Sequence, residues 1–591
     1  MPGRTDHDSS GHGRRIRTPA HATWRPAAAA PYCARPGTTG RVVLGPVRDP
    51  GLPTHPNQVH SMSKPVRVLC LGGGWAAVYL VKSLRRAIRR GDVELTVVSR
   101  ENYHTFHGFI PEMLVGRIQP QQLVTPARWV FQPARFHNAE IREIDADRRR
   151  VVTSRAIDGR EYALEYDHAL VALGAVDDLS RYPGLAEHTL RLKTYWDCVK
   201  ARSQILSALE MAEIETDPDE RRRLLTFVAV GGGFGGIEVA AELANYFEVL
   251  VQREFPGLDL ADFRMVVVHN GPEILPELGD SAPKLVGYAR KFLSDHRVEF
   301  RLNTRITAAT PEEAILSDGE RIQTRTILSC AGSAFSPLLD NLPFEQDRRG
   351  RLLVDSSGRV VGSDSLWAVG DCAAMPHPRG GTCPTVATYA MMGGKHVGKN
   401  LLRHLEGKPS KPFSFSGIGE GCSIGHRRAI VTLKGIPMTG VMGWLAWRAT
   451  FIALIPSWDR RIRILMDWLL TASFGRDIAN IRMNEPYGVR KELYEPGQDI
   501  VREGDVGKRL YVIAEGEVDV VQRREDGTEE HLATLGAGQH FGEVAVFRKK
   551  RRTATVRARS RVRLLSLGEE EAQSLSDAMQ PFGERVQSLP G

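Results

Sequence analysis

The chain has 591 residues, a net charge of +9, seven cysteines, and 42% hydrophobic and 25% charged residues. This composition is typical of globular proteins and excludes a mainly disordered, collagenous or coiled-coil chain. Seven cysteines without a C-x-x-C pair exclude a disulfide scaffold and the usual zinc modules, and they fit a reducing cytoplasm. No hydrophobic stretch reaches the roughly 18 residues that span a bilayer. Residues 1–61 and 413–482 each carry a net +5, so the basic charge is local and a nucleic-acid partner is not expected.

Residues 1–61 are rich in Pro, Gly, Arg and Ala and show neither a helix nor a strand period. We expect them to be disordered, because they bury too little apolar surface to offset the entropy of ordering. They are either a natural extension or absent from a protein whose translation starts at Met62. Their prolines argue against an organelle transit peptide, whose helix they would break.

From residue 66 to about 330, short apolar runs alternate with helical stretches, which predicts an α/β fold with parallel sheets. A strand at 66–71 leads into a G-x-G-x-x-A turn made by Gly72, Gly74 and Ala77. Gly72 permits the tight turn, Gly74 lets the backbone approach a pyrophosphate, and Ala77 allows close packing of helix on strand. The following helix offers free N–H groups to phosphate.

A second strand, at 226–230, leads into a full G-x-G-x-x-G made by Gly231, Gly233 and Gly236. Two fingerprints about 160 residues apart indicate two nucleotides, the arrangement in which a nicotinamide meets a flavin. Further on, a strand ends in Gly370-Asp371, where a carboxylate can bond the ribityl chain of a flavin, and the run ending at Gly174 is typical of a crossover between two domains.

These pieces, with Arg100–Phe106 and Leu275-Pro276, resemble the type II NADH dehydrogenases over about 66–482. The resemblance implies two Rossmann-like domains, with FAD on the first fingerprint and NADH or NADPH on the second. It implies that a hydride passes to the flavin and two electrons pass to a membrane quinone, without proton pumping.

Glu238 matches the acidic residue near the meeting point of nicotinamide, flavin and quinone, although it could instead only complement the helix dipole. The expected domains are 62–190 with 322–412 for FAD, 191–321 for NAD(P)H, 413–485 for the membrane and 486–591 for a regulatory ligand.

The chain departs from the family's pattern at both second strands, where an acidic residue usually bonds the adenosine ribose. Ser99 stands at the first position and can still hydrogen-bond a ribose. His269 stands at the second, and a His near Arg264 would tolerate a 2′-phosphate, which leaves NADH and NADPH both open. Met391 and Met392 replace amide side chains near the flavin and quinone, and so the oxidising substrate is less certain than the flavin.

Two other functions stay open. Sulfide oxidation would need cysteines that converge on the flavin, and Cys330, Cys372 and Cys383 are candidates by position alone. The other alternative is a redox sensor, a flavoprotein that turns over little and whose redox state gates the C-terminal domain. Disulfide reductase activity is excluded, because the first flavin helix carries no cysteine pair.

The segment 413–485 is basic and holds four of the nine tryptophans. Its apolar run at 441–455 is too short to span a bilayer, and tryptophans beside arginines are typical of a helix that lies in the membrane interface. We therefore expect peripheral attachment to an anionic membrane surface, on the cytoplasmic face of the cell membrane. A buried helical hairpin or a homodimer interface would use the same residue types.

Residues 486–591 show short alternating strands with glycine turns, which predicts a β-roll. Within them, 491–566 resemble a cyclic-nucleotide-binding domain, and the stretch 541–556 matches the family's phosphate cassette. The resemblance implies that Gly542 and Glu543 bind the cyclic nucleotide, Glu543 at the ribose hydroxyl, and that Arg552 pairs with the phosphate. Thr553 resembles the cGMP-selective variant, so cAMP and cGMP both remain candidates, as does a domain that has lost its ligand. Too few residues follow for a helix-turn-helix.

Overall fold

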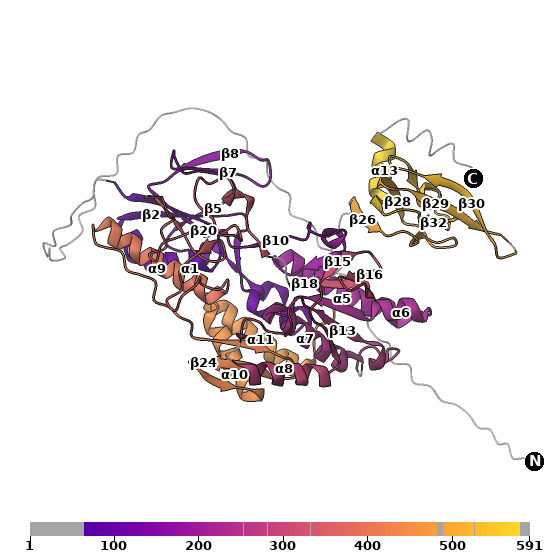
Figure 1. Ribbon diagram of the computed structural model, residues 1–591, viewed down its shortest axis with the longest axis horizontal. Helices are drawn as coiled ribbons and strands as arrows, with labels where there is room; N and C mark the ends of the chain where they lie inside the picture. Colours follow the sequence, from indigo (N-terminus) through magenta and orange to yellow (C-terminus); the bar gives the residue numbers. More distant parts are fainter. Residues whose placement is uncertain are drawn as a thin grey trace, which may run out of the picture. The chain divides into compact units, whose positions relative to one another are not determined.

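The computed structural model describes residues 64–578, except 252, 280–281, 331–332, 481–488 and 525. The expectation for 1–61 lies outside the described residues. An α/β body fills the chain to Phe474, and an all-β domain follows from Arg490 (Figure 1).

The first parallel sheet has the order β21-β9-β1-β2-β5. Its strands are β1 (Val66–Leu71), β2 (Val93–Ser99), β5 (Arg135–Asn138), β9 (His168–Val171) and β21 (Leu366–Ala368). Helix α1 (Trp75–Arg90) begins directly after the first glycine turn and packs against α9 (Ala387–Leu405). The two helices pack closely at Gly394, because the absence of a side chain there leaves room for the backbone of Ala76. A Cβ at this glycine would overlap Ala76 O. The first predicted strand and helix are thus confirmed.

The second parallel sheet has the order β11-β18-β12-β13-β14. Its strands are β11 (Thr189–Arg191), β12 (Thr226–Val230), β13 (Arg264–Val268), β14 (Val298–Arg301) and β18 (Thr326–Ser329). Helix α7 (Phe234–Val251) follows the second glycine turn, and α5 (Tyr195–Ile214), α6 (Pro218–Leu224) and α8 (Pro283–Asp295) complete the layers. The strand, glycine turn and helix predicted from the second fingerprint are all present.

Small antiparallel sheets, strand pairs and short helices accompany the two parallel sheets. One antiparallel sheet is β6 (Glu140–Asp145), β7 (Arg150–Ser154) and β8 (Glu161–Glu165), and another is β15 (Ile306–Ala309), β16 (Glu313–Leu316) and β17 (Arg321–Gln323). Two-stranded pairs are β3 (Tyr103–Thr105) with β4 (Val124–Pro126), β10 (Val176–Asp177) with β19 (Ser333–Ala334), and β20 (Leu352–Leu353) with β22 (Ala373–Ala374). Short helices are α2 (Ile110–Leu114), α3 (Ala127–Val130) and α4 (Leu185–His188).

The body ends in an antiparallel sheet and two helices. The sheet is β23 (Gly419–Ser423), β24 (Ala429–Leu433) and β25 (Ile436–Met438), and the helices are α10 (Gly440–Leu454) and α11 (Trp458–Phe474). The sequence predicted only helices over 413–485, so the sheet is a correction: its strands have three to five residues and the first contains two glycines, so no clear strand period is visible. Among the described residues, no helix is both long and apolar enough to cross a bilayer.

The all-β domain consists of two four-stranded antiparallel sheets with the orders β26-β33-β28-β31 and β27-β32-β29-β30. The first comprises β26 (Arg490–Tyr494), β28 (Arg509–Glu515), β31 (His540–Phe541) and β33 (Val562–Gly568). The second comprises β27 (Asp499–Val501), β29 (Val518–Arg523), β30 (Glu529–Leu535) and β32 (Thr555–Ala558). Both contribute to one buried cluster that includes Ile513, Val518 and Leu564. Helices α12 (Glu543–Phe547) and α13 (Glu569–Ala578) complete the domain.

Candidate functional site

The first glycine turn, at the end of β1, has the backbone that a dinucleotide requires. Gly72 has φ +119°, and a Cβ there would overlap the carbonyl oxygen of Ala172. The Cβ positions of Gly74 and Gly174 both face open space, while Ala77 is fully buried against the sheet. A pyrophosphate could therefore approach the backbone at the start of α1, and the residues present fit FAD.

Two uncharged side chains, Ser99 and His104, border this turn. The Ser99 side chain lies against Gly73, as a ribose-bonding residue at the end of β2 should. His104 Nδ1 lies 3.1 Å from Gly73 O, and burial lowers the pKa of His104 to about 4, so it is neutral at physiological pH. Its ring packs edge-on against Trp75, with centroids 4.6 Å apart.

The predicted Gly370-Asp371 pair follows β21, which lies in the same sheet as β1. Gly370 has φ +80°, a conformation that favours glycine. Burial raises the pKa of Asp371, and the ammonium of Lys193 acts in the opposite direction. The carboxylate is therefore only partly solvated, as expected of a group that bonds a cofactor hydroxyl.

The second glycine turn repeats the backbone of the first. Gly231 has φ +111°, and a Cβ at Gly236 would overlap Gly231 O, so α7 packs closely on β12. The ring of His269 lies against Gly232 at the end of β13, and burial lowers the pKa of this imidazole. A carboxylate that the sequence did not single out, Glu277, lies over Gly233.

The expected help of Arg264 in binding a 2′-phosphate is wrong. Arg264 begins β13 while His269 follows its other end, roughly 16 Å away at the rise of a β-strand. The guanidinium of Arg264 is also occupied, with Nε and Nη2 each 2.9 Å from the carboxylate of Glu299. Spacing in sequence misled here, because a strand sends nearby residues to opposite edges of the sheet.

Glu238 lies in the first turns of α7 and is only 7% exposed. Burial raises its pKa to about 8, opposed by the backbone N–H of Ser423, which donates to Glu238 Oε1 at 3.0 Å. This carboxylic acid is therefore mostly protonated at neutral pH. The donor comes from β23, so the C-terminal sheet completes the surroundings of Glu238, a contact that sequence reasoning missed.

A network of buried ion pairs joins α7 to the C-terminal helices. Arg117 Nε donates to Glu242 Oε2 at 3.0 Å, and Arg448 Nη2 donates to Glu112 Oε1 at 2.7 Å. Trp468 Nε1 donates to the other oxygen of Glu112 at 2.6 Å. Removing one partner of such a pair would leave an unpaired buried charge, which is strongly destabilising.

The tryptophans and arginines of the predicted interfacial segment divide between two faces. The Arg448 guanidinium lies 4.3 Å from the Trp444 ring centroid and 3.7 Å from that of Trp468, inside the protein. Trp447 is buried, whereas Trp458 is 74% exposed.

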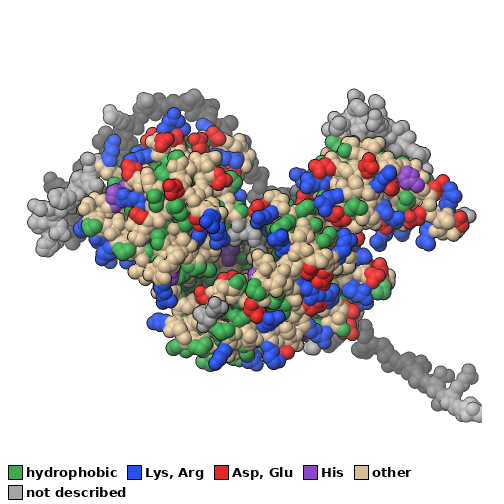
Figure 2. Space-filling model, in the orientation of Figure 1, with side chains coloured by type: hydrophobic (Ala, Val, Ile, Leu, Met, Phe, Trp, Pro, Cys, Tyr) green, Lys and Arg blue, Asp and Glu red, His purple; other side chains and the backbone are tan. Residues whose placement is uncertain are grey.

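The exposed face of α10 and α11 is mostly aliphatic, and hydrophobic side chains gather over this part of the lower edge of the molecule in Figure 2. Its members are Val441, Met442, Leu445, Trp458, Ile462, Leu465, Met466, Leu469, Leu470 and Phe474.

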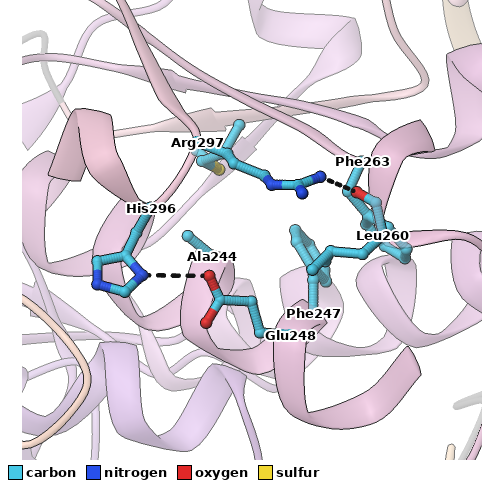
Figure 3. Close-up of a pocket in the computed structure, with 8 residues that line it drawn as sticks. Ala244, Phe247, Glu248, Leu260, Phe263, His296 and Arg297 are labelled. Atoms are coloured by element: carbon cyan, nitrogen blue, oxygen red, sulfur yellow. Dashed lines mark hydrogen bonds and ion pairs between the residues drawn. The ribbon is translucent and has the colours of Figure 1, made fainter. Parts of the chain in front are cut away.

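A cluster of Glu248, His296 and His426 ties the far end of α7 to α8 and to the turn after β23. Glu248 Oε1 lies 3.2 Å from His296 Nδ1, as Figure 3 shows, and Oε2 lies 3.3 Å from His426 Nε2. The two imidazoles are stacked, with centroids 4.0 Å apart and planes at 27°. The ligand atoms of the three groups lie within 4.8 Å of one another. The Asn245 amide also donates to His426 Nδ1, which leaves the proton of the neutral ring on Nε2. We describe the cluster as a hydrogen-bonded clamp.

The predicted cyclic-nucleotide residues lie together in the all-β domain. Gly542 has φ +91° and precedes α12, whose first residue is Glu543. Glu543 Oε2 is buried without a hydrogen-bond partner among the described residues, so it could accept a ligand hydroxyl. Arg552 is buried and donates to Gly542 O at 3.0 Å and to Arg509 O at 2.8 Å. A phosphate would therefore share or displace these carbonyls. Thr553 is exposed.

The cysteines named for sulfur chemistry are poor nucleophiles. Burial raises the pKa of the Cys330 thiol to about 12, and those of Cys372 and Cys383 to about 11. Each thiol is therefore protonated at neutral pH, whereas reactive cysteines act as thiolates.

Comparisons with known proteins agree with this arrangement. Residues 66–394 match the family described as pyridine nucleotide-disulphide oxidoreductase, 419–477 match the NDH2 C-terminal domain, and 491–578 match the cyclic nucleotide-binding domain. The fold and site thus define an α/β dinucleotide-binding flavoprotein, an oxidoreductase. More particularly, the chain belongs to the pyridine nucleotide-disulphide oxidoreductase family, in its type II NADH dehydrogenase branch, and carries a C-terminal cyclic nucleotide-binding domain.

Named relatives support the same placement. The chain is 26% identical over 420 residues to a probable NADH dehydrogenase of Dictyostelium discoideum, covering 70% of this chain and 91% of the relative. It is 27% identical over 417 residues to the type II NADH:quinone oxidoreductase NdhA of Mycobacterium tuberculosis, covering 68% and 86%. The structure of NDH2 from Plasmodium falciparum in complex with NADH shares its fold, with a TM-score of 0.65 at 16% identity over 70% of this chain and all of that one.

Proposed function

We propose that the chain is an FAD-dependent NAD(P)H:quinone oxidoreductase that works at a membrane surface, without pumping protons, and that a cyclic nucleotide regulates it. The observation that carries the catalytic part is Glu238, a buried acid with a pKa of about 8 at the start of the second fingerprint helix. Its hydrogen-bond donor, Ser423, belongs to the C-terminal sheet that leads into the exposed aliphatic face. The second fingerprint helix and the C-terminal sheet thus meet at Glu238.

Each residue of the site would have a simple role. The N–H groups at the start of α1 and the carboxylate of Asp371 would hold FAD, which, when bound, accepts a hydride and passes electrons on. The start of α7 would hold the dinucleotide substrate. Glu238, protonated at neutral pH, holds a proton beside the site, and reduction of a quinone to a quinol consumes protons.

The catalytic proposal is tested by purifying residues 62–591 and recording the flavin spectrum with NADH, NADPH and a quinone. We expect a yellow protein whose flavin bleaches with one of the nucleotides and recovers when quinone is added. Asp371→Ala should lower flavin occupancy. A flavin that is reduced but not reoxidised by quinone would contradict the proposal and favour the redox sensor.

We propose that the exposed aliphatic face of α10 and α11 lies on the membrane. Leu465, Leu469 and Phe474 are 50%, 59% and 81% exposed, and basic residues nearby would add about 1 kcal/mol each at an anionic surface. Replacing the three with Ser should move the protein from anionic liposomes to the supernatant, measured by cosedimentation. Met211→Ser with Ile214→Ser, on exposed positions of α5, is the matched control and should change nothing. Equal binding by both variants would contradict the proposal.

The regulatory proposal rests on Glu543 and Arg552. Arg552→Ala should weaken cyclic-nucleotide binding about a hundredfold, since a charged hydrogen bond contributes about 2–3 kcal/mol. Because Arg552 also bonds two backbone carbonyls, Glu543→Gln provides a second variant that keeps the side-chain volume. Lys550→Ala, which removes an exposed neighbouring cation, is the control. Calorimetry on the full-length protein without heat from cAMP or cGMP would contradict binding, and unchanged turnover with ligand would contradict regulation.

A further inference from the structure

The loop after β13 crosses the second fingerprint and carries a carboxylate onto it. Leu275 adopts φ +56°, and its backbone N–H donates to Gly232 O at 2.7 Å, which fixes the loop across the turn. Two residues later, Glu277 Oε1 accepts a hydrogen bond from the backbone N–H of Phe234, the first residue of α7, at 3.2 Å. A Cβ on Gly233 would overlap the same oxygen. Glu277 therefore caps the helix at the glycine that must stay bare for a ligand.

This position is the one where a fingerprint helix offers its N–H groups to a pyrophosphate. Glu277 already uses one of those donors and brings a negative charge that a pyrophosphate would meet. A second acid lies close by: burial and the charge of Glu277 both raise the pKa of Glu420, on β23. His269 is also within the field of Glu277, which acts to raise its pKa while burial lowers it.

We propose that Glu277 is a built-in competitor for the pyrophosphate of the dinucleotide substrate and sets its affinity. This inference rests on the proposed function, in which the second fingerprint binds NAD(P)H. Binding displaces the Glu277 carboxylate from Phe234 N–H, so part of the attraction between the helix and the pyrophosphate is offset. The substrate and its oxidised product are consequently held weakly and exchange quickly.

The test uses ADP-ribose, which carries the pyrophosphate but cannot reduce the flavin, and the flavin-loaded protein. Glu277→Gln removes the charge and keeps an oxygen that can still cap the helix, so the fold is retained. By calorimetry at low salt we expect ADP-ribose to bind this variant about two- to fivefold more tightly, the effect of an exposed charge at a helix N-terminus. Added salt should shrink the ratio, because Glu277 is exposed.

Two controls make the result specific. Glu273→Gln removes another carboxylate on the same loop, one that pairs with Arg290 instead, and should leave ADP-ribose binding unchanged. Adenosine, which has no phosphate, should bind the parent and Glu277→Gln equally. Unchanged or weaker ADP-ribose binding by Glu277→Gln would overturn the inference while leaving the proposed function in place. If neither the parent nor the variant binds ADP-ribose or NAD⁺, the assignment of the second fingerprint fails, and the inference fails with it.

Discussion

The two fingerprint helices begin with nearly the same motif and end in different surroundings. The turn before α1 is bordered by uncharged groups, Ser99 and neutral His104, and its Gly74 faces open space. The turn before α7 lies under a carboxylate. At the matching place in each helix, two residues past the motif, α1 carries Tyr79 and α7 carries the acid Glu238. The same backbone device can therefore serve a resident cofactor in one place and an exchanging substrate in the other, with neighbouring side chains making the difference.

The largest expected effect comes from adding a methyl group to the first residue of each turn. Gly72→Ala should lose most of its flavin, because Gly72 has a positive φ and its Cβ would overlap a backbone oxygen. Gly231→Ala should keep its flavin and lose dinucleotide binding. The flavin-to-protein absorbance ratio and calorimetry with NAD⁺ measure the two losses.

Gly91→Ala is the control for strain alone, because Gly91 has φ +84° at the end of α1 and a Cβ there meets only open space. It should lower stability and leave both nucleotides bound. Loss of flavin from Gly231→Ala rather than Gly72→Ala would reverse the assignment of the two turns.

An intermediate effect is expected from the acid behind the second turn. The pKa of Glu238 in the native protein, about 8, lies above the ordinary value of 4.5 for a glutamate, so the unfolded chain releases this proton at lower pH than the native protein does. The free energy of unfolding therefore falls as pH rises from about 4.5 to 8, by roughly 4 kcal/mol for this one group. Glu238→Gln should abolish this loss in urea unfolding measured across that range.

Tyr79→Phe is the matched variant on α1. Burial raises the pKa of Tyr79, so its hydroxyl stays protonated over the same range and its removal should leave the pH dependence unchanged. A parent protein and Glu238→Gln with parallel pH profiles would show that Glu238 is already ionised, and would contradict its role as a proton carrier.

The smallest effect is expected at the far ends of the two helices. Glu248 of α7 hydrogen-bonds His296 and has its other oxygen 3.3 Å from His426 Nε2, whereas the matching Arg89 of α1 is exposed. Glu248→Ala should lower the free energy of unfolding by about 1 kcal/mol, the usual contribution of one hydrogen bond. Arg89→Ala should change it by less than about 0.5 kcal/mol, as surface substitutions do. Equal melting temperatures for the two variants would show that the clamp adds no stability.

The sequence predicted the parts of this molecule that depend on local patterns. Both glycine turns, the strands before them and the helices after them follow from residues adjacent in the chain, and Asp371 follows from a strand that ends in Gly-Asp. The alternating strands of the C-terminal domain were equally visible. The structure confirms these elements. They could be predicted because glycine spacing and apolar periods depend on residues that are close together in the chain.

The remainder depends on contacts between distant residues. Ser423 lies 185 residues from Glu238, and Arg448 lies 336 residues from Glu112, so no local pattern indicates either pair. The inward turn of Trp444 and Trp468 was missed for the same reason, since an interfacial tryptophan and a buried one look alike in sequence. Glu277 reaches Phe234 only because Leu275 adopts a left-handed conformation, which its residue type does not suggest.

The burial of the thiols affects how readily the protein is oxidised by hydrogen peroxide. Reduced flavins leak electrons to dioxygen and generate hydrogen peroxide, which attacks thiolates and spares thiols. Burial is the main cause of the raised pKa at Cys70, Cys330, Cys372, Cys383 and Cys422, so each of these thiols keeps its proton at neutral pH. An enzyme that binds flavin as proposed should therefore turn over in air without accumulating sulfenic acid on these five cysteines.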